Sequence, residues 1–318
     1  MPQLDMPLAE LREYQGRNPK PDDFDRYWDD ALAEARAVDP RPELVPADFA
    51  LPGVECFDLY FTGTGGARVH CKYARPAGKT GVAAVMKFHG YSCDGGDWTE
   101  LCLWPATGMA ACMMEVRGQG GSSHDPGGHK FHTLRGHFIR GLEDSADNLF
   151  FRDVFLDTVI ATEVVAGFDE VDGDRMGAHG FSQGGALTLA CAALSDRIKR
   201  AAPVYPFLSD YKRVWEMDLA VKAYDELREF FRWRDPLHER EDEWFRRLGY
   251  IDVQHLAPRV DGEVLLGTGL MDNICPPSTV FAAYNKIPGK KDVRVYPDFG
   301  HEKLPGFEED VFTFLHGL

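Results

Sequence analysis

The chain has 318 residues, of which 44% are hydrophobic and 12% aromatic, a composition typical of a globular protein with a large core. Asp and Glu number 51 against 35 Lys and Arg, which gives a net charge of −16. This negative charge disfavours nucleic acids, anionic membranes and polyanionic substrates as partners, and it favours a small neutral molecule.

No stretch approaches the roughly 18 consecutive apolar residues that cross a bilayer, and the first residues lack the basic and apolar segments of a secretory signal. The seven cysteines are scattered and contain no C-x-x-C pair. This pattern favours reduced thiols packed as small apolar side chains over disulfides or a zinc site. We therefore expect a cytoplasmic protein.

The first 55 residues are predicted to form a helical extension, because apolar side chains recur at helical spacing between residues 7 and 38. A Pro-rich stretch at 40–52 should end the helical segment. A β-hairpin is predicted next, since apolar residues alternate at 57–61 and 69–73 on both sides of a Gly-rich turn.

From residue 82 onward, short apolar runs alternate with helical stretches. Six strands are predicted, at 82–88, 110–114, 175–179, 200–204, 264–266 and 293–296. Most lack polar alternation, as expected for parallel strands covered by helices on both faces. A helical insertion at 207–256 is either a wall of the substrate pocket or a purely structural cover. Because repeats and flexible linkers are lacking, we expect one doubly wound α/β domain over 1–318.

The strongest local motif is GFSQGG, from Gly180 to Gly185, which contains the pattern G-x-S-x-G. It follows the predicted strand at 175–179 and opens an apolar helix at 186–194, the setting of a nucleophile elbow. Glycines allow the strained turn and the close helix–strand contact, and the helix N-terminus favours developing negative charge. An incidental serine in a Gly-rich turn is the alternative, which the flanking strand and helix disfavour. We predict that Ser182 is the nucleophile.

A serine nucleophile needs a base and an orienting acid, which follow it in the order acid, then histidine, in the α/β-hydrolase fold. Asp272 lies just beyond the predicted strand at 264–266, and His301 lies just beyond the strand at 293–296. Loops at these strand ends gather at the functional edge of an α/β sheet. Asp298 is a less favourable acid, because it shares a short loop with His301.

The tetrahedral intermediate of acyl transfer needs two fixed N–H donors. One is expected from the backbone of Gln183, the residue after the nucleophile, and the other from Tyr91 in the loop after the first predicted parallel strand. The alternative for His89-Gly90-Tyr91 is a tight loop with no part in catalysis.

Two further motifs favour structural roles. Arg117, in an Arg-Gly-Gln segment that does not match a dinucleotide fingerprint, is predicted to tie loop carbonyls together. Four histidines at 124, 129, 132 and 137 lack a carboxylate or cysteine that would complete a metal site, so we expect loop residues near the pocket mouth.

Together these motifs resemble the acetyl xylan esterases and cephalosporin C deacetylases of carbohydrate esterase family seven. The resemblance rests on Arg117-Gly118-Gln119, Gly180-Phe181-Ser182-Gln183-Gly184 and His301-Glu302. It extends over His89-Gly90-Tyr91, Asp97-Trp98, Gly120 to Gly128, Tyr205 to Tyr211, Gly269 to Asp272 and Cys275-Pro276-Pro277. The likeness covers most of the chain, including the insertion.

The resemblance implies an α/β-hydrolase fold, the triad Ser182, His301 and Asp272, and oxyanion donors at Tyr91 and Gln183. It also implies deacetylation of acetylated xylo-oligosaccharides and cephalosporin C, with perhydrolysis in some members. Such proteins are cytoplasmic homohexamers whose active sites face an internal cavity. The loop from Ser92 to Gly96 varies, which leaves the substrate preference open.

The predicted reaction is a two-step acyl transfer through an acetyl-enzyme, which needs no metal or organic cofactor. An esterase or peptidase with a different acyl preference would use the same triad on the same fold. A binding protein that has lost activity is a third possibility, which the complete set of catalytic residues disfavours.

Overall fold

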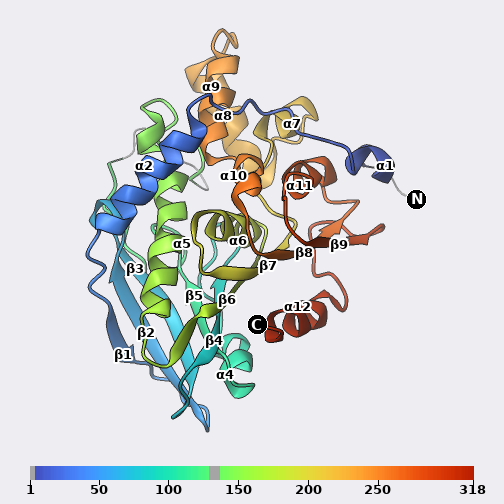
Figure 1. Ribbon diagram of the computed structural model, residues 1–318. Helices are drawn as coiled ribbons and strands as arrows, with labels where there is room; N and C mark the ends of the chain where they lie inside the picture. The colour runs from blue at the N-terminus through green and yellow to red at the C-terminus, as the bar shows by residue number, and fades with distance from the viewer. Residues whose placement is uncertain (1–3, 129–136) are drawn as a thin grey trace.

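A computed structural model of the protein describes residues 4–128 and 137–318. One sheet runs through this part of the chain, with helices on both faces (Figure 1). Its strands are β1 (Glu43–Pro46), β2 (Val54–Thr62), β3 (Arg68–Pro76), β4 (Val82–Phe88), β5 (Ala110–Met114), β6 (Val171–Phe181), β7 (Ile198–Val204), β8 (Glu263–Gly269) and β9 (Lys291–Tyr296).

The strand order is β1-β2-β3-β5-β4-β6-β7-β8-β9. The first three strands are antiparallel, and β3 also pairs antiparallel with β5. Every neighbouring pair from β5 to β9 is parallel. The prediction of a mostly parallel sheet is therefore confirmed, and the carboxyl ends of β4, β6, β7, β8 and β9 share one edge.

Helices cover both faces of this sheet. They are α1 (Leu8–Leu11), α2 (Phe24–Ala37), α3 (Trp98–Leu101), α4 (Leu103–Ala106), α5 (Phe150–Ala166), α6 (Gln183–Leu194), α7 (Tyr211–Glu216), α8 (Asp225–Arg234), α9 (Glu241–Leu248), α10 (Val253–Leu256), α11 (Pro277–Tyr284) and α12 (Phe307–His316). In Figure 1, α5 and α6 cover one face with α2 outside them, and α4 and α12 cover the other face. Helices α7 to α10 gather at the top of that view.

The hairpin and the parallel strands form as predicted. Strands β2 and β3 pair without interruption from Val54 opposite Pro76 to Thr62 opposite Arg68. The connecting turn contains Gly65 at φ +61°, which glycine adopts without steric cost. Strands β4 and β8 are buried along nearly their whole length, as expected for strands covered on both faces.

The helical extension predicted for the first 55 residues needs correction in two places, although the helical segment ends before the Pro-rich stretch as predicted. The helical pattern at 7–38 is interrupted: α1 ends at Leu11 and α2 begins at Phe24, with Pro19 and Pro21 between them. Proline lacks the N–H of the helix ladder and disfavours helical geometry at the residue before it. The Pro-rich stretch contains β1, whose proline is tolerated because the strand lies at the sheet edge.

The insertion predicted at 207–256 is helical and contains α7 to α10. By contrast, α5 did not stand out in the sequence. Its residues are buried on nearly every side, so it lacks the amphipathic pattern that identifies a surface helix. In the part of the chain that the structure describes, none of the helices has the length and apolar character that would let it span a membrane.

Candidate active site

Ser182 lies at the sharp turn between β6 and α6, at the carboxyl edge of the sheet. Its backbone has φ 57° and ψ −119°, a region that costs energy for a residue with a side chain and persists only when its surroundings enforce it. The Ser182 N–H donates to the Val204 carbonyl at 3.0 Å, and the Phe207 N–H donates to the Ser182 carbonyl at 3.0 Å. The segment after β7 therefore holds the strained serine from both sides.

The glycines of this turn allow three backbones to meet. A Cβ atom added to Gly184 would lie 2.1 Å from the Phe88 carbonyl oxygen, and one added to Gly180 would lie 2.6 Å from the same atom. A Cβ atom on Gly185 would lie 2.5 Å from the Val204 carbonyl oxygen. Any side chain at these positions would force the helix away from the strands beside it.

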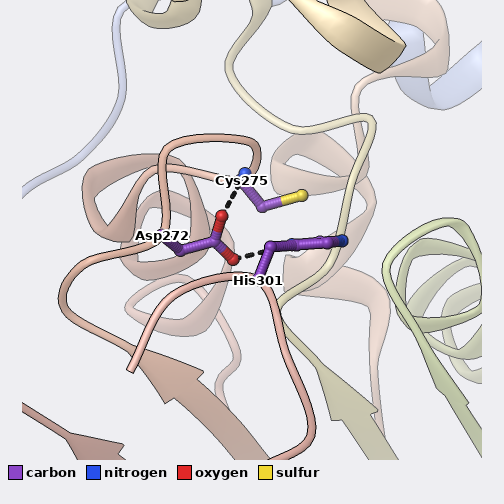
Figure 2. Close-up of side chains that lie close together, drawn as sticks. All are labelled: Asp272, Cys275 and His301. Atoms are coloured by element: carbon purple, nitrogen blue, oxygen red, sulfur yellow. Dashed lines mark hydrogen bonds and ion pairs between the residues drawn. The ribbon is translucent and has the colours of Figure 1, made fainter. Parts of the chain in front are cut away.

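Asp272 and His301 form a hydrogen-bonded pair that fixes the orientation of the imidazole (Figure 2). One carboxylate oxygen of the fully buried Asp272 accepts the backbone N–H groups of Ile274 and Cys275, each at 2.8 Å. The other oxygen lies 2.8 Å from Nδ1 of His301. A carboxylate can only accept, so Nδ1 carries the proton and donates it. This tautomer leaves Nε2, which points away from Asp272 in Figure 2, unprotonated and basic.

His301 and Ser182 share neighbours at the end of β7. The ring of Tyr205 packs against the His301 ring with 4.5 Å between centroids, and Phe207, two residues later, holds the Ser182 carbonyl. The alternative acid Asp298 is exposed to solvent. The structure thus brings the loops of Ser182, Asp272 and His301 to one site, as their places at strand ends predict.

Cys275 is an unpredicted member of this site. Its sulfur lies within 4.8 Å of ligand-type atoms of both Asp272 and His301 (Figure 2). Burial raises the pKa of the Cys275 thiol well above its usual value, and a hydrogen bond with the Ser182 side chain offsets only part of that effect. A thiol in this state is a poor nucleophile and a poor metal ligand. Its position instead links the serine to the acid–base pair.

The loop of the predicted oxyanion donor Tyr91, residues 89–96 and called the oxyanion loop below, follows β4 and is held in place by its own side chains. Nε2 of His89 accepts the Val116 N–H at 2.9 Å, so Nδ1 carries the proton and donates to the Gly90 carbonyl at 2.7 Å. Burial lowers the pKa of His89 and keeps the ring in this neutral form.

Tyr91 is anchored by its phenol. The hydroxyl accepts the His137 N–H at 2.5 Å and donates to Oε2 of Glu226 in α8 at 3.4 Å. Its ring packs on Phe207 with 5.0 Å between centroids. Within residues 4–128 and 137–318, neither the Tyr91 nor the Gln183 backbone N–H donates a hydrogen bond to another residue. Neither of the two N–H groups predicted for the oxyanion hole is therefore engaged by another residue in this part of the chain.

A pair of side-chain amides joins the oxyanion loop to the elbow. Nε2 of Gln119 donates to Oε1 of Gln183 at 2.7 Å, and Nε2 of Gln183 donates back to Oε1 of Gln119 at 3.0 Å. The same Gln119 oxygen accepts the Ser92 N–H at 3.0 Å. The sequence analysis gave Gln119 no role of its own within the Arg-Gly-Gln segment, and only the three-dimensional structure identifies its partner.

Arg117 has the predicted structural role, with different partners. Its guanidinium makes two parallel 2.7 Å bonds to the carboxylate of Asp157 in α5. One loop carbonyl, that of Thr64, also accepts from it at 3.0 Å. The main partner is thus a buried carboxylate and not a set of loop carbonyls, because a buried guanidinium needs a counter-charge.

Of the four histidines between 124 and 137, two lie outside the described residues, namely 129 and 132. His124 is exposed and His137 is half-buried against Phe150. Among the described residues, the one group of side chains close enough to share an ion is Asp272, Cys275 and His301.

The comparisons with known proteins agree with this geometry. The sequence model of the acetyl xylan esterase (AXE1) family matches residues 1–318, the whole chain. The chain belongs to the acetyl xylan esterase family. The family expected from the sequence motifs is therefore confirmed, and the prediction of an acetyl esterase is confirmed at the level of the family.

Solved members of the family share the entire fold. Acetyl xylan esterase 1 from a Thermoanaerobacterium species is 54% identical, with a TM-score of 0.97 and 98% of both chains covered. An acetyl xylan esterase from a Paenibacillus species is 36% identical, with a TM-score of 0.94, 98% of this chain and 99% of that chain covered. These matches confirm the predicted α/β-hydrolase fold.

The acetyl esterase Axe7A of Xylanibacter ruminicola is 26% identical over 286 residues, which are 87% of this chain. The chain spans 62% of the length of that relative. The elbow and the acid–base loops lie within the matched family region, which covers the whole sequence.

Proposed function

We propose that this protein is a serine esterase that removes acetyl groups from small neutral esters through an acetyl-enzyme intermediate. The observation that carries the proposal is the pair of Asp272 and His301, at 2.8 Å, on the same sheet edge as the strained Ser182. Membership of the acetyl xylan esterase family supports acetylated xylo-oligosaccharides as substrates, and the motif resemblance adds cephalosporin C.

In the first step, Oγ of Ser182 attacks the acetyl carbonyl while Nε2 of His301 takes its proton. Asp272 holds Nδ1–H and stabilises the imidazolium that forms. The carbonyl oxygen becomes an oxyanion, which accepts from the backbone N–H groups of Tyr91 and Gln183. We expect both donors to matter, because removal of a single oxyanion donor typically lowers kcat about 10²–10³-fold.

Collapse of this intermediate completes the first step: His301 gives its proton to the departing alcohol, and the acetyl group remains on Ser182. Water then enters, loses a proton to Nε2 and attacks the acetyl carbon. Collapse of the second tetrahedral intermediate releases acetate and restores the serine hydroxyl. Each proton moves through the same imidazole, whose orientation depends on Asp272.

The test is hydrolysis of p-nitrophenyl acetate by Ser182→Ala, with Ser195→Ala as the control. Ser195 lies at the other end of α6 and is also buried, so its variant reports the effect of losing a hydroxyl elsewhere on the same helix. We expect the Ser182 variant to fold and to lose at least about 10³-fold in kcat. A Ser182 variant that keeps its turnover would refute the proposal.

The same preparation tests the acyl preference. We expect rates to fall steeply from acetyl to butyryl and octanoyl esters, because a small acyl pocket excludes longer chains. Preferential turnover of octanoyl esters, or of blocked peptides, would favour the esterase or peptidase with a different acyl preference.

We also propose a cytoplasmic homohexamer, on the strength of the family resemblance. All seven cysteines are free thiols and six of them are buried, which suits a reducing compartment. Light scattering coupled to gel filtration checks the assembly, and a monomer at micromolar concentration would contradict it. Any peracid formation with added peroxide would come from the same acetyl-enzyme and is measurable in parallel.

A further inference from the structure

Phe181, the last residue of β6, exposes its ring although it directly precedes the serine. The side chain is 48% exposed, and it belongs to neither of the two hydrophobic clusters of the described residues. Single exposed apolar residues are ordinary on protein surfaces, so exposure alone assigns no role. Its place beside the catalytic residues is what distinguishes Phe181.

The ring lies against the oxyanion loop. A Cβ atom added to Gly90 would come within 3.2 Å of a ring carbon of Phe181, so the ring rests directly on the Gly90 backbone. Gly90 precedes Tyr91, and Phe181 precedes Ser182. The half-exposed ring therefore lies against the residue before one expected oxyanion donor, and it belongs to the residue before the expected nucleophile.

We propose that Phe181 is a specificity-determining residue whose exposed ring receives the C–H face of a pyranose when one of its acetyl esters reaches Ser182. This inference rests on the proposed function and deepens it, because it assigns to Phe181 the preference for a sugar ester over a simple ester of the same acyl group. A pyranose with equatorial substituents presents axial C–H groups on its faces, and a flat aromatic ring covers such a face while the polar substituents stay in water. The contact suits a neutral sugar.

The contact with Gly90 also favours a flat ring at position 181 over other apolar side chains. A ring that rests on a glycine backbone is held in a narrow range of positions, so little conformational freedom is lost when substrate binds. A branched aliphatic side chain would keep the apolar area and lose the flat face. Substitution by leucine and by tyrosine therefore separates the two contributions.

The experiment compares kcat/KM on tetra-O-acetyl xylopyranose with kcat/KM on ethyl acetate, which has the same acyl group and no sugar ring. We expect Phe181→Leu to lower the ratio of the two values about 3- to 10-fold, mainly through KM for the sugar ester, as for the loss of one aromatic contact. Phe181→Tyr, which keeps the flat ring, should hold the ratio within about 2-fold. Trp233→Leu is the control, since Trp233 is 71% exposed on α8 and should leave the ratio unchanged.

An unchanged ratio in Phe181→Leu, with both esters hydrolysed, would overturn this inference and leave the proposed function intact. An equal fall of the ratio in the leucine and tyrosine variants would also overturn it, because the cause would then be a disturbed oxyanion loop. If the unmodified protein hydrolyses neither ester, the proposed function fails and the inference fails with it.

Discussion

The nucleophile elbow and the helices above it are held by different forces. At the elbow, residues 180–185, backbone hydrogen bonds and close approaches to glycine fix the geometry, and none of these contacts involves an ionisable group. The helical cover, residues 207–259, packs into the main hydrophobic core and in addition uses buried carboxylates to fix its backbone. Both oxygens of the fully buried Asp252 accept the Asp210 N–H, at 3.1 and 3.0 Å.

The same carboxylates attach the N-terminal segment to the cover. One oxygen of Asp210 accepts the backbone N–H groups of Arg17 and Asn18, each at 2.8 Å, and the other accepts the Tyr14 hydroxyl at 2.8 Å. From this comparison we expect that the turn around Ser182 keeps its geometry over a wide pH range, whereas the stability of the helical cover depends on pH. Four substitutions test how far this separation extends.

The largest effect is expected for Gly184→Ala. The added methyl group would lie 2.1 Å from the Phe88 carbonyl oxygen, so the helix must move away from the strand. We expect the free energy of unfolding in urea to fall by more than about 4 kcal/mol, together with most of the activity. Gly167→Ala is the matched control, because its nearest contact is an ordinary 3.4 Å. An equal loss of unfolding free energy in the two variants would show that close contacts of Gly184 do not fix the elbow.

Arg117→Met tests whether a buried ion pair, that of Arg117 with Asp157, also stabilises the protein around the elbow. The change leaves Asp157 buried without its counter-charge, although burial already raises the pKa of Asp157 to about 6. We expect the free energy of unfolding to fall by about 3–5 kcal/mol at neutral pH. The double variant with Asp157→Leu should recover most of that loss, as measured by urea denaturation. No recovery would mean that the arginine acts through packing and not through charge.

Asp252→Asn tests whether the helical cover makes the stability of the protein depend on pH. Burial, with the nearby charge of Asp210, raises the pKa of Asp252 from 3.8 to about 7. Ionisation is therefore harder in the folded state, and the stability that the protonated carboxyl contributes is lost as the pH rises from about 4 to about 7. Between about pH 5 and pH 8, the unmodified protein should lose about 1–3 kcal/mol relative to the variant.

Thermal or urea unfolding of both proteins over that range provides the measurement. Asp298→Asn serves as the control, since Asp298 is exposed. Parallel stability curves for the unmodified protein and Asp252→Asn would show that the cover is not sensitive to pH through this group.

The smallest effect is expected for Asp5→Asn. Asp5 accepts the Ser278 N–H at 2.8 Å and an Arg213 N–H at 2.7 Å, and so connects the first segment of the chain to α11 and α7. Losing its charge should cost about 1–2 kcal/mol in the free energy of unfolding. We expect kcat to change less than about 3-fold, because the Asp272 loop before α11 keeps its own backbone bonds. A much larger fall in kcat would show that the cover controls the catalytic loops.

The sequence predicts the parts of this protein that local chemistry determines. The elbow, Asp272 and His301 follow from motifs at the ends of apolar strands in a fixed chain order. Contacts between distant side chains could not be predicted in this way: Gln119 with Gln183, Cys275 with Ser182, and the carboxylates of the cover. Each depends on which loops fold together, and because amide, thiol and carboxylate groups occur throughout the sequence, residue type alone does not identify the partner.

The helices and strands also differ in whether local sequence or tertiary packing determines them. Strands with continuous apolar runs and the hairpin with its glycine turn were predictable from the residues themselves. Strand β1, which contains a proline at the sheet edge, and α5, buried on nearly every side, lack the local pattern on which prediction depends. Tertiary packing determines these elements.

The most direct test of the catalytic assignment is covalent labelling with diethyl p-nitrophenyl phosphate, mapped by mass spectrometry of peptides. We expect one diethylphosphoryl group on Ser182, no labelling in Ser182→Ala, and labelling slowed by at least about 10²-fold in His301→Ala, since the serine then lacks its base. A label on any other residue, or an unchanged rate without His301, would contradict the triad.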